Sequence, residues 1–244
     1  MAEHLADHAG QVRRLFDAKA AMWPAKYAPD GRLTGRLTRL AAALSEHVPA
    51  AGRVLDLGCG TGELARAAAA RGMRVTACDI SEQMLRRAAQ RDPGGAVEWV
   101  QLRLNWQTLP FQPRTFDAVV ASSVLEYVDD PAAVLSECAR VLRKSGVVLC
   151  TVPDLSHPIR WLEFLAGLAA RLPWVRAASD RWPRCQRYLT YLRISRHRAL
   201  ARWWRTTGKQ AGLYLVPCPP GLDGRAPLRL LVFRVPGDAK VRPS

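Results

Sequence analysis

Short apolar runs along this chain alternate with longer segments in which apolar residues recur every three or four positions. The short runs predict buried strands at residues 54–57, 73–78, 97–103, 116–121, 147–152, 213–216 and 228–235. The periodic segments predict helices at residues 3–20, 34–47, 63–71, 81–91, 131–142 and 199–212. Strands that alternate with helices indicate an α/β fold built on a mostly parallel sheet.

Local chemistry marks two of the helix starts. Ser81 is a good N-cap, because its hydroxyl oxygen can accept an N–H group of the first turn. Pro131 fits the first turn of a later helix, where its missing N–H is harmless. The Arg-Lys-Ser-Gly stretch at 143–146 is expected to close that helix before the strand at 147–152.

A glycine-rich turn joins the first strand to the helix at 63–71. Glycine permits unusual backbone dihedrals and lets a ligand approach the chain closely. A strand–turn–helix unit also places free helix N–H groups at the carboxyl end of a parallel sheet, where such sheets bind nucleotides. The spacing differs from the dinucleotide fingerprint G-x-G-x-x-G/A, because Glu63 stands where the last small residue should fall. A nicotinamide cofactor is therefore disfavoured.

The stretch 54–65, VLDLGCGTGELA, closely resembles motif I of the class I S-adenosylmethionine (SAM) dependent methyltransferases. Within that class it is similar to the small-molecule, methyltransferase-11 type found in ubiquinone biosynthesis, and the resemblance continues over about residues 16–153. It implies a Rossmann-like, seven-stranded, mostly parallel sheet with helices on both faces and an antiparallel last strand. It also implies a helical acceptor cap between strands five and six, and SAM as the methyl donor.

Motif I and the second strand supply most of the expected cofactor-binding residues. Those of motif I are Asp56, Gly58, Cys59, Gly60 and Gly62. Asp79 ends the second strand about 20 residues past the turn, where the two oxygens of an acid can bind both ribose hydroxyls. Ile80 follows it, and Ser122 is expected at the mouth of the site after the fourth strand.

The stretch 104–111, LNWQTLPF, resembles the family's Gly-Asp-Ala-x-x-Leu-Pro-Phe, whose Asp accepts a hydrogen bond from the adenine amino group. Asn105 stands at that position here, and its amide oxygen can still accept that bond. Trp106 replaces a small residue, and it either stacks on adenine or packs in the core. These departures leave open a protein that binds SAM or a nucleotide without catalysis.

The segment 16–40 resembles the lead-in of small-molecule methyltransferases, which folds over the bound cofactor. By that resemblance Tyr27 and Arg36 line the cofactor or acceptor pocket. Arg36 would meet the cofactor carboxylate, with a solvated helix face as the alternative. Trp23 is a third candidate for the pocket by the same resemblance, although packing against the core is its expected role.

Methyl transfer from a sulfonium is a direct substitution on an activated donor, so alignment and exclusion of water supply much of the catalysis. No catalytic triad is needed, although an oxygen acceptor would benefit from a base. By position, Glu126 and Tyr127 after the fourth strand and His157 after the fifth are the candidates. A structural role is the alternative for His157, and no metal site is expected.

Segment 155–205 differs in composition from the rest of the chain. It holds eleven Arg, no Lys, two acidic residues and five of the eight Trp, in a chain of net charge +15. Trp161, Leu165, Leu168 and Leu172 form one helical stripe, which is expected first of all to pack on the domain. A basic helix lying on an anionic membrane is the second interpretation. A nucleic-acid surface is the third, and no RNA-binding motif supports it.

We expect one domain over residues 1–244, divided into a helical lead-in (1–50), a SAM-binding core (51–153), the basic cap (154–205) and C-terminal strands with a tail (206–244). No apolar run reaches the roughly 18–20 residues of a transmembrane helix. Glu3 and Asp7 argue against a signal peptide, and six scattered cysteines fit a reducing cytoplasm. The expected partner is a small-molecule acceptor, with an anionic or lipid-linked acceptor at the membrane surface as the alternative. Nothing in the sequence specifies an oligomeric state.

Overall fold

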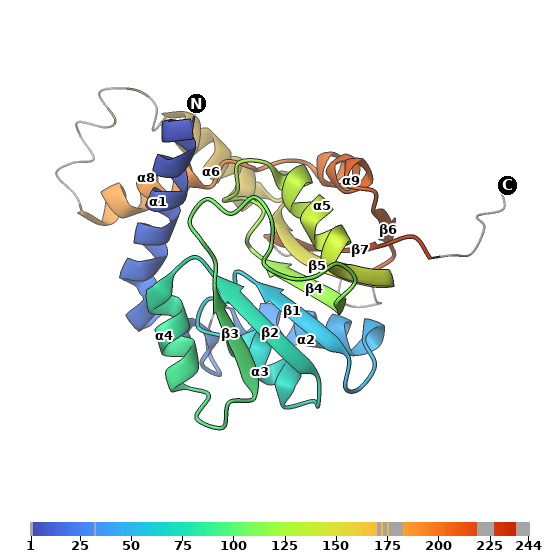
Figure 1. The fold of residues 1–244 in the computed structure, drawn as a ribbon. Coiled ribbons are helices and arrows are strands. Elements are labelled where there is room, and N and C mark those ends of the chain that lie inside the picture. The colour runs from blue at the N-terminus through green and yellow to red at the C-terminus, as the bar shows by residue number, and fades with distance from the viewer. Residues whose placement is uncertain are drawn as a thin grey trace, which may run out of the picture.

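A seven-stranded sheet forms the centre of the computed structural model (Figure 1). The structure describes residues 2–31, 33–169, 172, 175, 183–218 and 227–237. The strands are β1 (Arg53–Leu57), β2 (Arg74–Asp79), β3 (Val97–Gln101), β4 (Phe116–Ser122), β5 (Leu142–Pro153), β6 (Tyr214–Val216) and β7 (Leu228–Arg234). Their order is β3-β2-β1-β4-β5-β7-β6, and β7 runs antiparallel to both of its neighbours. The predicted Rossmann-like architecture is confirmed.

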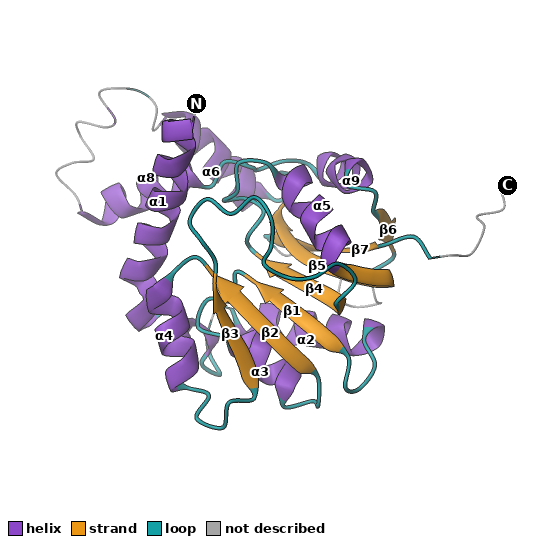
Figure 2. Cartoon of the chain, viewed as in Figure 1, coloured by secondary structure: helices purple, strands orange, loops and turns teal. Residues whose placement is uncertain are grey.

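Helices cover both faces and one edge of this sheet (Figure 2). They are α1 (Ala2–Lys19), α2 (Thr34–His47), α3 (Glu63–Ala69), α4 (Glu82–Gln90), α5 (Pro131–Val141), α6 (Pro158–Ala169), α8 (Pro183–Ile194) and α9 (Ala201–Gln210). Two short 3-10 turns, η1 (Ala20–Met22) and η2 (Pro24–Tyr27), connect α1 to α2. The predicted starts are confirmed at α4, where the Ser81 hydroxyl accepts the Met84 N–H, and at α5, where Pro131 occupies the first turn.

The sheet separates two apolar layers, because successive residues of a strand point to opposite faces. On one face, Leu55 and Val119 pack with α5 and α9. On the other, Val54 and Val120 pack with α2 and α3. Because helices cover both faces, successive residues of a strand are all buried, and these strands therefore appear in the sequence as continuous apolar runs.

A third group of helices lies beyond the carboxyl ends of the strands. There α1 packs against α8, and α8 packs against α6 (Figure 1). Val12 and Leu15 of α1 join Ile194 at the end of α8 in a small apolar cluster. These helices therefore form a cover over the edge of the sheet at which a ligand would bind.

Strand β5 begins earlier than the sequence indicates. Residues 143–146 do not close α5, since β5 starts at Leu142, and Leu142 pairs with Phe116 of β4. Ala118 then pairs with Val147, so a bulge absorbs the polar residues in between, with Ser145 at a φ of 63°. The apolar pattern marked only the buried part of the strand and missed its exposed, bulged start.

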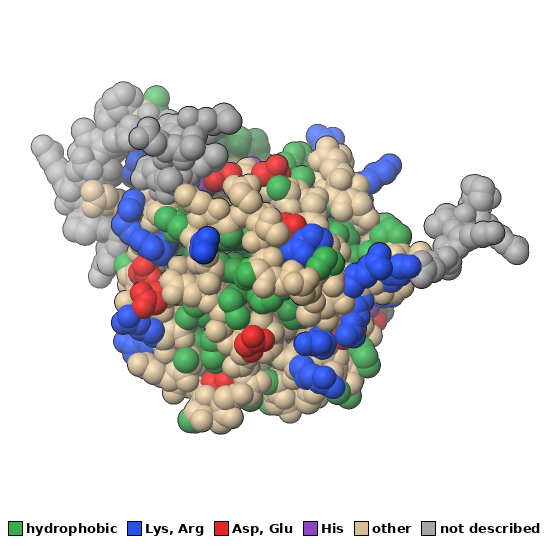
Figure 3. Space-filling view, in the orientation of Figure 1, with side chains coloured by type: hydrophobic (Ala, Val, Ile, Leu, Met, Phe, Trp, Pro, Cys, Tyr) green, Lys and Arg blue, Asp and Glu red, His purple; other side chains and the backbone are tan. Residues whose placement is uncertain are grey.

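The stripe on α6 does not pack on the domain, contrary to the first expectation. Trp161, Leu165, Leu168 and Leu172 are all exposed. The two predicted cap residues Trp174 and Trp182, much of the loop at 217–224 and the tail at 238–244 lie outside the described residues. On the face shown in Figure 3, Lys and Arg gather over α1 and α4 and near the C-terminal strands.

Three thiols are buried in the centre of the fold. Cys78 of β2, Cys138 of α5 and Cys150 of β5 are free and have no exposed surface. Burial raises the pKa of Cys138 to about 12, and it raises the pKa of Cys78 and Cys150 as well. They act as small apolar side chains in the core. No helix in the described part of the chain is long and apolar enough to cross a bilayer.

Candidate active site

A cavity of roughly 1430 Å³ opens at the carboxyl ends of β1, β2 and β4. Ligands of open α/β sheets bind at this place. Strands β2 and β4 lie on opposite sides of β1, so the chain connections run in opposite directions from it and leave a crevice at the carboxyl ends of the strands. The volume exceeds the about 300–1,000 Å³ of an ordinary small-molecule site. The cavity therefore has room for two ligands at once.

The glycine turn after β1 forms one wall of this cavity. Gly58 and Gly60 have positive φ values of 69° and 56°, and both line the cavity together with Cys59. A Cβ atom on Gly58 would lie 2.5 Å from Cγ2 of Val124, so no other residue fits there. The turn thus presents bare backbone to the cavity.

Gly62, the last glycine of the predicted motif, stands at the start of α3. Its φ is 75° and it caps the start of α3, but it is not among the residues that line the cavity. A Cβ atom there would lie 2.3 Å from the ring of Trp99. The structure therefore explains Gly62 by the packing of α3 against β3.

Asp79 braces the glycine turn from the end of β2. One of its carboxylate oxygens accepts the Gly60 N–H at 2.9 Å, and the other accepts the Ser81 N–H at 2.8 Å. Burial raises the pKa of Asp79, while these two N–H groups act in the opposite direction. Asp79 and its neighbour Ile80 both line the cavity, as predicted.

Asp56 also faces the cavity, from within β1. Its side chain is buried, and Oδ2 has no hydrogen-bond partner among the described residues. Burial, together with the charges of Asp79 and Glu63, raises the pKa of Asp56 to about 7. A buried carboxyl oxygen without a partner is costly unless a ligand supplies a donor.

Asn105 and Trp106 line the cavity beside Leu104. The Asn105 side chain is exposed, so its amide is available to a ligand. Trp106 is half-buried and packs against the core layer of α5. Trp106 therefore contributes both to the core and to the wall of the cavity.

The lead-in closes the cavity from the N-terminal side. Arg36 donates from Nη2 to the hydroxyl of Tyr27 at 2.9 Å and from Nη1 to the hydroxyl of Ser123 at 2.7 Å. Arg36 and Tyr27 both line the cavity, so the solvated-face alternative for Arg36 is wrong. Burial raises the pKa of Tyr27.

Trp23 also lies at the cavity, although packing in the core was expected. Its indole nitrogen is 3.2 Å from the position that a Cβ on Gly60 would take. The ring meets Phe16 edge-on at 5.5 Å, and the Lys26 ammonium lies 3.5 Å from its centroid. The aromatic ring covers the glycine turn, and only glycine allows this approach.

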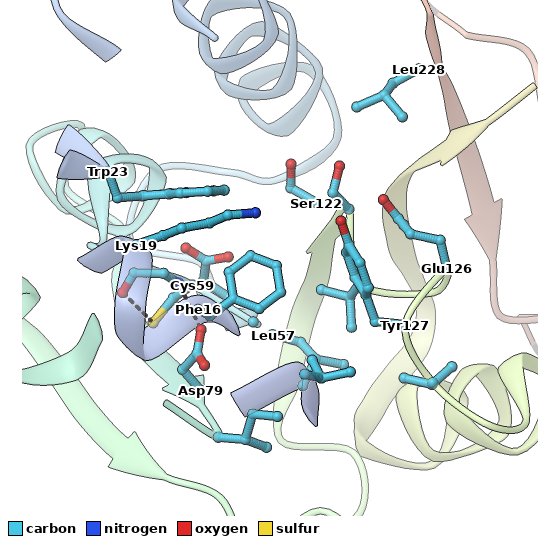
Figure 4. Close-up of a pocket in the computed structure, with 18 of the residues that line it drawn as sticks. Phe16, Lys19, Trp23, Leu57, Cys59, Asp79, Ser122, Glu126, Tyr127 and Leu228 are labelled. Carbon is cyan, nitrogen blue, oxygen red and sulfur yellow. Dashed lines mark hydrogen bonds between the residues drawn. The ribbon is translucent and has the colours of Figure 1, made fainter. Parts of the chain in front are cut away.

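Glu126 and Tyr127 stand on the opposite side of the cavity. Figure 4 shows Ser122, Glu126 and Tyr127 facing Trp23, Cys59 and Asp79 across it. The Glu126 carboxyl is buried and accepts a hydrogen bond from Ser123, but Oε2 has no partner in the part of the chain that is described. Burial raises the pKa of Glu126 to about 7, against the lowering effect of the Arg36 charge.

Tyr127 stands edge-on to Phe16, with ring centroids 5.3 Å apart. Burial raises the pKa of Tyr127 well above its usual value, so the phenol stays protonated. A protonated phenol can donate a hydrogen bond but does not act as a base.

His157 is not brought to the cavity. Its ring nitrogen Nδ1 accepts the backbone N–H of Ile159 at 3.3 Å, and the backbone N–H of His157 donates to the carbonyl of Asp154. The imidazole therefore caps the start of α6. This is the structural role that the sequence left as the alternative.

Four residues at the far end of the cavity were not predicted from the sequence. Arg160, Glu163, Tyr188 and Tyr191 line it. Arg160 donates to Glu163 at 2.6 Å, to the Tyr191 hydroxyl at 3.1 Å and, through Nε, to the carbonyl of Pro227 at 2.9 Å. The available signal was the Arg–Glu spacing of three residues, which places both side chains on the face of α6 opposite its apolar stripe.

Comparison with known proteins places this site in a family. The model of the methyltransferase domain family matches residues 55–150. The demethylmenaquinone methyltransferase of Tropheryma whipplei is 32% identical over 75% of this chain and 76% of its own length. The ubiquinone biosynthesis O-methyltransferase of Xylella fastidiosa is 38% identical over 42% of this chain and 43% of its length. The chain spans about half the length of the first curated relatives that it matches, from 43% to 59%.

Solved structures share the fold at lower identity. A SAM-dependent methyltransferase from Methanosarcina mazei aligns with a TM-score of 0.59 and 16% identity, over 80% of this chain and 97% of that one. The cyclase SpnF aligns with a TM-score of 0.64 and 18% identity, over 94% of this chain and 97% of its own. These likenesses concern the fold alone, and the reaction has to be argued from the site.

Proposed function

The chain belongs to the class I SAM-dependent methyltransferases, and from that membership we propose that it methylates a small, quinone-type acceptor in a biosynthetic reaction. The observation that carries the proposal is the single cavity of about 1430 Å³ with two different walls. One wall is the glycine turn with Asp56 and Asp79, and the other holds the buried carboxyl of Glu126. The acceptor class comes from the relatives, which are named for quinone biosynthesis.

The residues of the first wall fit SAM. Gly58 and Gly60 leave the backbone open to a ligand. The unpartnered Oδ2 of Asp56 can accept a hydrogen bond from that ligand. Asp79 offers carboxylate oxygens of the kind that bind ribose hydroxyls, and the Arg36 guanidinium suits a carboxylate. When bound, SAM supplies an activated methyl group on a sulfonium.

Glu126 acts in this proposal as the base for the acceptor hydroxyl. A general base works best when its pKa lies near the working pH, and burial raises that of Glu126 to about 7. Ser123 and Arg36 hold the carboxyl in place from the protein side. The unpartnered Oε2 is then the atom that receives the proton.

The aromatic residues around Glu126 suit a planar ring. Tyr127 is edge-on to Phe16 and tilted against Tyr191, and all three rings line the cavity. Lys19 lies 5.8 Å from the Phe16 ring centroid and 5.7 Å from that of Tyr191. A cation beside aromatic walls favours an acceptor that becomes an anion when it loses its proton.

We also place the enzyme in the cytoplasm. Cys59, Cys78, Cys138 and Cys150 form no disulfide. Free thiols at this number are typical of a reducing compartment.

Two measurements test the proposal. Calorimetry should detect binding of SAM and S-adenosylhomocysteine, whereas NAD should not bind. Methyl-labelled SAM incubated with the protein and a cell extract should then label an organic-soluble small molecule. Label in RNA or protein, or tight binding of NAD alone, would show the proposal to be wrong.

Glu126→Gln separates binding from chemistry. We expect kcat to fall by about 10²–10⁴-fold, the usual contribution of a general base, with unchanged affinity for S-adenosylhomocysteine. Glu82→Gln is the matched control, since Glu82 is an exposed acid on α4 that pairs only with Arg86 at the surface. Equal turnover in the wild type and Glu126→Gln would remove the base from the mechanism.

A further inference from the structure

Helix α6 has its polar side facing inward. The side chains of Arg160 and Glu163 are only 11% and 13% exposed and point to the cavity end of the fold. The apolar residues Ile159, Trp161, Leu162, Leu165 and Leu168 are instead between 43% and 63% exposed. None of the residues of α6 is buried. An ordinary surface helix of a soluble protein has the opposite arrangement.

Polar contacts fix the helix in this orientation. Arg160 binds Glu163, Tyr191 and the carbonyl of Pro227, and Nε of Arg198 lies 3.7 Å from Glu163. Turning the apolar side inward would expel this charged group and break these bonds. The exposed apolar face therefore belongs to the folded state and is not a loosely packed core helix.

The segment that carries this face is strongly basic in sequence. Residues 155–205 include eleven Arg and two acidic residues, and one of the two acids, Glu163, is paired with Arg160 and Arg198. Helix α8, which packs against α6, adds the exposed Arg193. Exposed apolar residues, a tryptophan and surrounding arginines are the combination that binds acidic bilayers. A protein partner would have to offer an unusually acidic groove.

We propose that the outward face of α6, formed by Ile159, Trp161, Leu162, Leu165 and Leu168, docks the protein on an acidic lipid bilayer. The apolar side chains would enter the headgroup boundary, and the arginines of the cap would contact anionic headgroups. The contact lies in the plane of the membrane surface, along a helix of 12 residues.

Docking on this face would also determine how the acceptor enters. Ile159 is 52% exposed on the docking face and at the same time lines the cavity, next to Pro227 and Leu228. The cavity mouth would then meet the bilayer, and the acceptor would be a ring with an apolar tail drawn from the lipid. This second step rests on the proposed methyltransferase function, whereas the docking itself does not.

Vesicle flotation tests the docking. The probes are vesicles of phosphatidylcholine mixed with phosphatidylglycerol, and vesicles of phosphatidylcholine alone. The wild type should float with the acidic vesicles at low salt, and less of it should float at about 1 M salt, where charges are screened beyond about 3 Å. The double variant Leu162→Gln/Leu165→Gln should partition about tenfold less, since it removes two of the inserted side chains. Both residues are exposed, so the fold should be unaffected.

Tyr214→Gln/Leu215→Gln is the matched control, because these residues are similarly exposed on the far edge strand β6. It should float like the wild type. No flotation of the wild type on acidic vesicles, or equal flotation of the α6 variant, would overturn the proposal. So would a wild-type dimer that the α6 variant converts to a monomer without any vesicle binding, because the face would then contact a second copy.

Calorimetry with S-adenosylhomocysteine on the same proteins keeps the two proposals apart. Cofactor binding without flotation would reject the docking and leave the methyltransferase function in place. Flotation without cofactor binding would reject the methyltransferase function and leave the docking in place.

Discussion

The Arg36 guanidinium donates a 2.7 Å hydrogen bond to the hydroxyl of Ser123, a residue 87 positions away in the chain. Ser123 has a φ of 56°, which is uncommon for a residue other than glycine, and its hydroxyl also bonds to the Glu126 carboxyl. Arg36 lies on α2, and Ser123 and Glu126 lie on the loop after β4. One arginine thus connects the lead-in that closes the cavity to the carboxyl proposed as the base.

We expect Arg36→Met and Ser123→Ala to be coupled. Each should lower affinity for S-adenosylhomocysteine, and a double-mutant cycle should give an interaction free energy of about 1.5–3 kcal/mol, the range for a hydrogen bond to a charged group. Calorimetry supplies the affinities and urea unfolding the stabilities. Arg86→Met, at an exposed surface pair, is the control. Strictly additive effects would mean that the 2.7 Å contact carries no energy.

Gly58→Ala should weaken cofactor binding. The new Cβ would lie 2.5 Å from Val124 at a φ of 69°, so the turn must shift at the place where the ligand approaches the backbone. We expect about a tenfold or greater loss of affinity and a destabilisation of about 1–2 kcal/mol. The control is Gly94→Ala, which meets open space in the loop before β3. Normal binding by Gly58→Ala would place the cofactor elsewhere.

Asp79→Asn should loosen the glycine turn. The carboxylate accepts two N–H groups, from Gly60 and Ser81, and an amide can accept only with its single oxygen. The unpaired N–H should cost about 1–3 kcal/mol of stability, and affinity for S-adenosylhomocysteine should fall at least about tenfold. Chemical denaturation and calorimetry measure the two effects. An unchanged free energy of unfolding would show that the turn does not depend on Asp79.

Stability should decrease as the pH rises from about 5 to 7. The pKa values of Asp56 and Glu126 are raised by burial to about 7, so the folded state keeps protons that the unfolded state has already released. Each group then lowers the free energy of unfolding by at most about 1.4 kcal/mol per pH unit in this window. Above pH 7 the loss is complete for both groups.

Glu126→Gln should remove about half of that slope and should be more stable than the wild type at pH 8, by up to about 3 kcal/mol. The same variant is expected to lose turnover, as is common where a site keeps a destabilising group for its chemistry. Thermal melts from pH 5 to 8 give the comparison, with Glu82→Gln as the reference. A wild-type stability that rises over this range would contradict the raised pKa values.

Much of the cofactor wall could be read from the sequence, because local patterns specify it. The glycine turn, Asp79 and the Ser81 cap are all determined within a few residues of one another. The antiparallel direction of β7 followed from the resemblance to the family, since spacing alone does not determine strand direction. Gly62 was assigned to the cofactor because it belongs to the motif, whereas Trp99, far along the chain, is what requires a glycine there.

The rest could not be predicted for physical reasons. The start of β5 is polar and exposed, so periodicity gives no signal for it. The inward side of α6 depends on Tyr191 and Pro227, which are distant in sequence from Arg160. Trp23 was assigned to the core because large aromatics are usually buried there, but its place over Gly60 follows from the path of the lead-in.

The three buried thiols can report how often the core of this fold opens. Cys78, Cys138 and Cys150 have no exposed surface and a raised pKa, so a thiol reagent can reach them only when the sheet opens. Their rate of alkylation would therefore report how often the core opens, without any engineered label. Because a ligand that binds only the folded state lowers the open population by a factor of one plus the ratio of its concentration to Kd, the same rate would screen extracts for the natural acceptor before its product is known.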